Sequence, residues 1–269
     1  MSNELRAIAP GAEGHFQLWF YAAVLRLIVQ LDTSAAHFPF LEGYAAGLQR
    51  YGVSPDAPAA GRAWETQIAD WEQRNASSSK RLPLLALRQH ASLSSVALTL
   101  LMCAGLPEED ARFGDVFAAL NGDPTHRRPT VGLLSAWWDD GTGEVRAALR
   151  TLLATGLLHV PNAEAPRSEW ILHPPALLWE CLQGEPPARP APWASFCPPE
   201  QLPDIANIIL DAQLARELAS VPELLASGAL PALIVRGPQH NGRRTVVGAL
   251  ARAAGYGLLL LEGLGSSTD

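Results

Sequence analysis

The residues best suited to chemistry lie near the C-terminal end of the chain, in "GPQHNGRRT" at residues 237–245. Its two glycines have the spacing of a phosphate-binding loop, G-x-x-x-x-G-K-[ST], in which backbone N–H groups and a helix N-terminus hold nucleotide phosphates. The preceding "ALIV" predicts a short buried parallel strand, and the following "VVGALARAAG" predicts a helix. The candidate nucleotide-binding residues are therefore Gly237, Gly242, Arg243, Arg244 and Thr245.

Two substitutions separate this loop from one that hydrolyses ATP. Arg243 stands at the lysine position, and Arg244 stands where a hydroxyl would bind Mg²⁺. A planar guanidinium does not replace a compact ammonium. Thr245 comes one residue late, a rotation of about 100° on a helix, so its hydroxyl should point away from the metal. We expect weak nucleotide binding at most; the alternative is a tight turn that only opens a helix.

Hydrolysis also needs an acidic residue that holds Mg²⁺, usually at the end of a later strand. "YGLLLLE" predicts a strand that returns from the helix, so residues 231–262 would form one right-handed βαβ unit. The chain ends at Asp269, before a later strand can form, and Glu262 alone is no substitute. We expect residues 231–269 to be an incomplete P-loop α/β unit without turnover by this chain alone.

Three regions precede this unit, and together they predict a mainly α fold. Residues 1–80 form a helical N-terminal region that begins with "HFQLWFYAAVLRLIVQL". That stretch is short for a membrane span and contains Arg26, so its helical spacing of apolar residues predicts a buried amphipathic helix. Residues 81–184 predict helices followed by a β-hairpin, the order of a winged-helix domain. Residues 185–230 are a proline-rich linker followed by a helix.

Local signals place the elements of the second region. Ser94 or Ser95 is the expected N-cap of a helix that ends before Gly105, and Pro107 suits the first position of the next helix. "LLHV" and "EWILH" predict the two arms of the hairpin, which would bring His159 opposite His173.

Composition excludes several classes of protein. Apolar residues make up 48% of the 269 residues and charged residues 17%, which is enough apolar material for packed cores. The formal net charge is −7, which gives no general reason to expect nucleic-acid or acidic-membrane binding. Three widely separated cysteines without a CxxC pair indicate reduced thiols in a cytoplasmic protein and no structural metal.

The charge of residues 82–184 bears on DNA binding in particular. This region has seven arginines, no lysine and eleven acidic residues, a balance of −4. DNA binding depends on cations that neutralise phosphates, and the expected recognition helix offers only Arg146 and Arg150. Arg127 and Arg128 could contact a phosphate, but we expect them to pair with neighbouring helices.

Two longer stretches resemble a bacterial AAA+ ATPase family with an N-terminal winged-helix region. They are "LSSVALTLLMCAGLPEEDARFGDVFAALNGDPTHRRPTVGLLSAWW" and "LDAQLARELASVPELLASGALPALIVRGPQHNGRRTVVGALARAAGYGLLLLEG". The resemblance implies an oligomeric remodelling machine, some relatives of which accompany contractile injection particles. It implies ATP and Mg²⁺ as cofactors of the complete protein, and a homo-oligomer formed through the missing AAA+ domain. Walker B, sensor and arginine-finger residues have no counterpart here.

Three hypotheses for function follow. The first is an N-terminal interaction and regulatory region of such an ATPase, which recognises a protein partner. The alternative is a winged-helix DNA-binding regulator. The third is an enzyme of another kind, but His126, His159 and His173 fall in no metal-ligand or nucleophile pattern.

Overall fold

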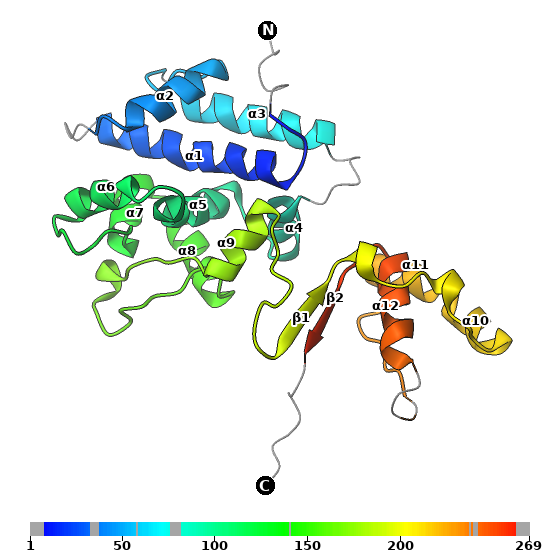
Figure 1. The fold of residues 1–269 in the computed structure, drawn as a ribbon. Coiled ribbons are helices and arrows are strands. Elements are labelled where there is room, and N and C mark those ends of the chain that lie inside the picture. Colours follow the sequence, from blue (N-terminus) through cyan, green and yellow to red (C-terminus); the bar gives the residue numbers. More distant parts are fainter. Residues whose placement is uncertain are drawn as a thin grey trace. The chain divides into compact units, whose positions relative to one another are not determined.

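The computed structural model describes residues 8–32, 38–57, 59–75, 82–139, 141–236, 238 and 242–261 (Figure 1). The chain divides into two compact units, Met1–Glu185 and Pro186–Asp269. Helices dominate the described residues, so the predicted mainly α class is confirmed.

The first unit is helical apart from a few β-bridges. Its elements in chain order are α1 (Ala12–Asp32), α2 (Leu41–Arg50), α3 (Ala60–Asn75), α4 (Pro83–His90), α5 (Ser95–Glu109), α6 (Arg112–Asn121), α7 (Val131–Trp138), α8 (Glu144–Ala154), η2 (Arg167–Glu169) and α9 (Ala176–Gln183).

Helix α1 lies at the centre of the first unit. It contacts α2 and α3 on one side and α4, α5 and α9 on the other (Figure 1). Leu18, Ala23, Val24 and Leu27 are completely buried, so the predicted buried helix is confirmed. It is covered on several faces because helices from both predicted regions, 1–80 and 81–184, share one hydrophobic core with it. No helix among the described residues has the length and apolar character needed to cross a membrane.

Helix α5 is longer than predicted. Ser94 is its N-cap as expected, and its hydroxyl accepts a hydrogen bond from the Ala97 N–H at 3.2 Å. The predicted end before Gly105 is wrong, because the helix continues through Gly105 and Pro107 to Glu109. Ten consecutive residues, 97–106, are buried, and this packing outweighs the helix-breaking tendency of the two residues.

Gly105 has a packing role that its sequence position does not reveal. A Cβ atom at this position would lie 2.1 Å from the indole ring of Trp179 on α9. The residue is therefore a site of close approach between two helices, where the absence of a side chain makes room for the ring.

A buried polar cluster joins three of these helices. The His15 Nε2 and Glu72 Oε1 atoms are 2.8 Å apart, and Arg88 donates to Glu72 Oε2 at 2.7 Å. The His15 ring stacks on Trp71 at a centroid distance of 5.4 Å, while the Trp19 Nε1 atom lies 3.3 Å from Glu72 Oε1. The cluster connects α1, α3 and α4, and the sequence patterns described above did not reveal it.

The second unit has short helices and one pair of strands. Its elements are β1 (Ala194–Cys197), η3 (Pro199–Gln201), η4 (Ile205–Asn207), α10 (Ala212–Leu218), α11 (Val221–Ala226), α12 (Arg243–Ala253) and β2 (Leu258–Leu261). The strands pair antiparallel, with Ala194 opposite Leu261 and Cys197 opposite Leu258. The predicted proline-rich linker thus contributes a strand to this unit.

Replacing Glu72 by Gln should lower the free energy of unfolding by about 3 kcal/mol at neutral pH, because Arg88 and His15 would lose their buried anionic partner. Burial alone would raise the pKa of the Glu72 carboxyl, but the hydrogen bonds and positive charges of His15 and Arg88 outweigh burial and lower it. The carboxylate therefore stabilises the fold above its unfolded pKa of about 4.5, and this stabilisation disappears as pH falls through the lower folded pKa.

Denaturant unfolding between pH 3 and pH 8 measures this difference. Glu65→Gln is the matched control, because Glu65 lies on the same helix in an exposed 3.4 Å pair with Arg26 and should change stability by less than about 1 kcal/mol. Equal effects of the two variants at neutral pH would contradict the role given to Glu72.

Candidate functional site

The structure places four of the five predicted nucleotide-binding residues at the start of α12. Gly242 precedes the helix with a φ of +80°, a conformation that suits glycine. Arg243, Arg244 and Thr245 form the first turn, and the side chains of the last two are exposed. Gly237 lies outside the described residues. The predicted helix is confirmed, and its buried face packs Gly248 against Leu202 and Leu258.

The predicted parallel strand before the loop is wrong. Residues 231–236 lie outside any strand, and the Leu233 and Ile234 side chains are 37% and 76% exposed. The predicted returning strand does form, as β2, but it pairs antiparallel with β1. A buried parallel strand needs neighbouring strands, and among the described residues no strand lies beside residues 232–235. The part of the chain that the structure describes therefore forms no parallel βαβ unit.

Within the described residues, the part of this segment that could contact a nucleotide is the start of α12. A helix N-terminus with two arginines attracts anions. Among the described residues, no group of three or more His, Cys, Asp or Glu side chains could hold a metal ion. The described part of the segment can therefore supply positive charge but no catalytic metal site.

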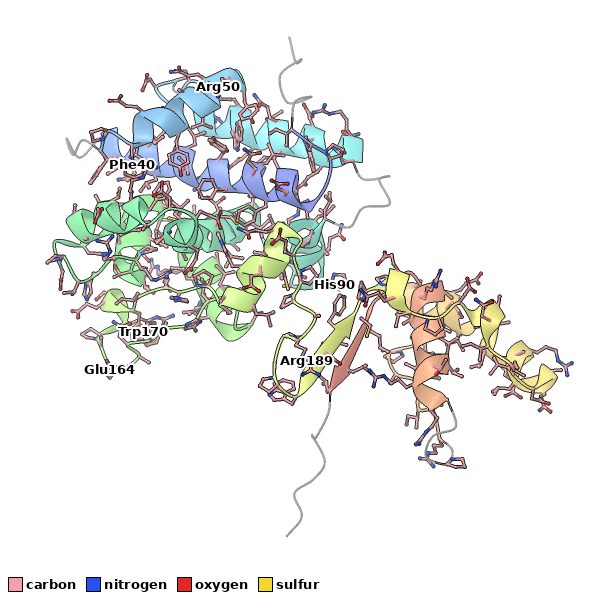
Figure 2. The ribbon with its side chains drawn as sticks, viewed as in Figure 1. Phe40, Arg50, His90, Glu164, Trp170 and Arg189 are labelled. Carbon is pink, nitrogen blue, oxygen red and sulfur yellow. The ribbon has the colours of Figure 1, made fainter. Side chains whose placement is uncertain are left out.

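The region from α5 to α9 brings sequence-distant segments together through short bridges. Thr130, just before α7, pairs antiparallel with Ile171, and His159, after α8, pairs with His173. The predicted contact between the two histidines is confirmed, with ring centroids 4.6 Å apart. Figure 2 labels Glu164 in the connection between the arms of this hairpin and Trp170 at the start of its second arm.

Arginines that could contact nucleic-acid phosphates are held by acidic neighbours. Arg127 donates to Asp115 and to the Ala111 carbonyl, and Arg128 donates to Glu108. These pairings confirm the expectation that both arginines contact neighbouring helices. They also neutralise cations that a phosphate backbone would need.

The expected recognition helix, α8, follows the same pattern. Arg146 Nε donates to Asp139 Oδ2 at 3.1 Å. The backbone N–H of Gly143 and the Arg146 guanidinium, partly opposed by burial, lower the pKa of the Asp139 carboxyl. Asp139 is therefore anionic beside the helix at neutral pH, which would repel a phosphate backbone.

Exposed apolar side chains gather in the second unit. Its buried apolar residues are few: Ala194, Leu202, Val221, Ala249 and Leu250. Large apolar side chains that are more than a third exposed are Trp193, Ile209, Leu214, Leu224, Leu233, Ile234, Tyr256, Leu259 and Leu261. Exposed apolar surface on this scale is typical of a protein-interaction site.

The open edge of β2 belongs to this surface. β1 pairs with one edge of β2, and the outer side of β1 contacts its own preceding turn, where Phe196 N–H donates to the Ala188 carbonyl. Among the described residues no strand lies along the other edge of β2. All four residues of β2 are leucines, so the edge lacks the charged or proline residues that usually prevent pairing with another strand.

Comparison with protein-family models, with curated proteins and with solved structures found no match to this chain.

The geometry predicts that the chain binds ATP more weakly than micromolar and releases no phosphate from it. Calorimetric titration with ATP and Mg²⁺, together with a phosphate-release assay on the purified 269-residue chain, measures both. Arg243→Ala is the informative variant. Micromolar binding that this variant abolishes would contradict the prediction and show that the arginine can replace lysine.

Proposed function

We propose that this chain recognises a protein partner, as the N-terminal interaction and regulatory region of a AAA+ remodelling ATPase. The observation that carries the protein-recognition part is the set of exposed apolar side chains of the second unit, which includes Leu259 and Leu261 of β2. A leucine strand that has no strand on its second side among the described residues suits an extended polypeptide, which can add a strand to it.

The ATPase part of the proposal is supported by the resemblance of the sequence. In the complete protein, ATP and Mg²⁺ would be the cofactors, and the AAA+ domain would form a homo-oligomer. Within the described residues, Gly242 and the first turn of α12 would contribute to the nucleotide loop. The free thiols of Cys103, Cys181 and Cys197 support a cytoplasmic location.

A winged-helix assignment for residues 81–184 is supported by the order of elements. Two helices are followed by the extended segment at Thr130, by α7 and α8, and by the hairpin that contains His159 and His173. Winged helices bind either DNA or proteins, so the fold does not choose between them. The acidic balance of the region and its paired arginines favour a protein.

Replacing Leu259 by Glu should abolish partner capture, because a partner strand would have to bury the introduced carboxylate when it pairs with β2. Cross-linking and affinity capture from the source cells measure partner retention by the wild-type chain and the variant. Leu177→Glu is the matched control, since Leu177 is also a large exposed apolar residue but lies on α9 in the first unit. Equal loss of the partner in both variants would place the interface elsewhere.

DNA binding is the second candidate function, favoured by the order of elements alone. A gel-shift titration with random duplex DNA at low salt should show no retained complex. Tight binding that weakens steeply as salt rises would reverse the preference for a protein partner.

A further inference from the structure

The hairpin after α8 is closed at its open end by a pair of histidines and nearer its tip by Asn162, whose side chain donates to the Glu169 carbonyl and accepts from the Ile171 N–H, each at 2.9 Å. His159 N–H donates to the His173 carbonyl at 2.9 Å, and His173 N–H donates back to the His159 carbonyl at 3.1 Å. Residues opposite each other in an antiparallel pair present their side chains on the same face, and the imidazole rings accordingly lie 4.6 Å apart. The same two residues thus supply the backbone bonds of this bridge and its titratable groups.

Two charged side chains from other elements face this pair. Glu108, at the end of α5, accepts a hydrogen bond from Arg128, and its Oε1 atom is 3.6 Å from His173 Nε2. Arg128 comes from the connection between α6 and α7. The Nη1 atom of Arg128 and the Nδ1 atom of His173 are shielded from solvent and have no hydrogen-bond partner among the described residues. His173 is therefore surrounded by the Arg128 guanidinium, by the His159 imidazole and by the Glu108 carboxylate, which is hydrogen-bonded to Arg128.

We propose that the His159–His173 pair is a proton-sensitive latch, which holds the open end of the hairpin closed while the His173 imidazole is neutral and releases it when His173 takes up a proton. A proton on His173 would place a second positive charge beside Arg128 and against the His159 ring. Glu108 offsets this charge only in part, because its Oε1 already accepts from Arg128.

The direction of the titration agrees with this geometry. Burial, Arg128 and His159 lower the pKa of His173 below its ordinary value of 6.5, and Glu108 and the backbone at Pro174 oppose them incompletely. A histidine with a lowered folded pKa binds protons more readily once the hairpin is open. The closed state is therefore fully stable above pH 6.5 and loses stability as pH falls from 6.5 towards the folded pKa.

Opening would change the face that this region presents to a partner. The second bridge, at Thr130 and Ile171, ties the other arm to α7 through the hydrogen bond from Val131 N–H to the Trp170 carbonyl at 2.9 Å. Release of the histidine pair would therefore free the segment between α8 and Asn162, while Asn162 stays bonded to the second arm and Trp170 stays tied to the helices. The latch stands independently of the proposed function.

Amide hydrogen exchange of the full chain between pH 8 and pH 5, corrected for the intrinsic pH dependence of exchange, tests the latch. We expect the His159 and His173 amides to lose protection as pH falls, while the amides of α1 and α5 keep theirs. His173→Gln should remove this response. His90→Gln is the control, because His90 is an exposed histidine on α4 that bonds the Ala86 carbonyl, and it should leave the response unchanged.

A second variant covers the case in which His173→Gln does not close the hairpin at any pH. Arg128→Gln removes the positive charge beside His173 while Glu108 still faces that histidine, so the folded pKa of His173 should rise towards 6.5 and the loss of protection should become smaller. Constant protection in the wild-type chain while ring-proton NMR shows His173 titrating would overturn the proposal. So would an undiminished loss of protection in Arg128→Gln, or simultaneous loss in α1 and α5.

Discussion

The contact between α1 and α5 is the constraint on which the first unit depends. Both helices are almost entirely apolar along the surfaces where they meet, and residues 97–106 of α5 are buried without interruption. Removing this much apolar surface from water is the main favourable term in the fold. It explains why α5 continues past Gly105 and Pro107, since ending the helix earlier would leave part of that surface without its partner. The helices of residues 12–75 and of 83–183 thus form one body.

The buried carboxylate inside this body has partners of opposite charge. Glu72 is buried, but His15 and Arg88 supply the hydrogen bonds and positive charge that a buried carboxylate requires. Near the surface, acidic residues likewise hold Arg127, Arg128 and Arg146. Three of the seven arginines of residues 82–184 are therefore neutralised by acidic neighbours within the region, which is the physical reason to favour a protein partner over DNA.

The second unit differs because its apolar residues do not enclose one another. Two strands and short helices bury few side chains, and the leucine edge of β2 remains open within the described residues. The face of a two-stranded ribbon cannot be covered by the short elements that accompany it. The small size of this sheet explains two observations. Apolar side chains of the second unit stay exposed, and residues 232–235 have no neighbouring strand among the described residues to pair with.

Sequence patterns were enough to predict the mainly α class, a helix cap at Ser94 or Ser95, the helix after Gly242 and the meeting of His159 with His173. These features depend on local spacing, capping groups and turn residues, which act within a few positions of the chain. Tertiary structure alone decided the length of α5, the cluster around Glu72, the pairing of Glu108 with Arg128 and the antiparallel partner of β2. Each of these depends on residues at least 15 positions apart in sequence, and local patterns do not say which distant groups will meet.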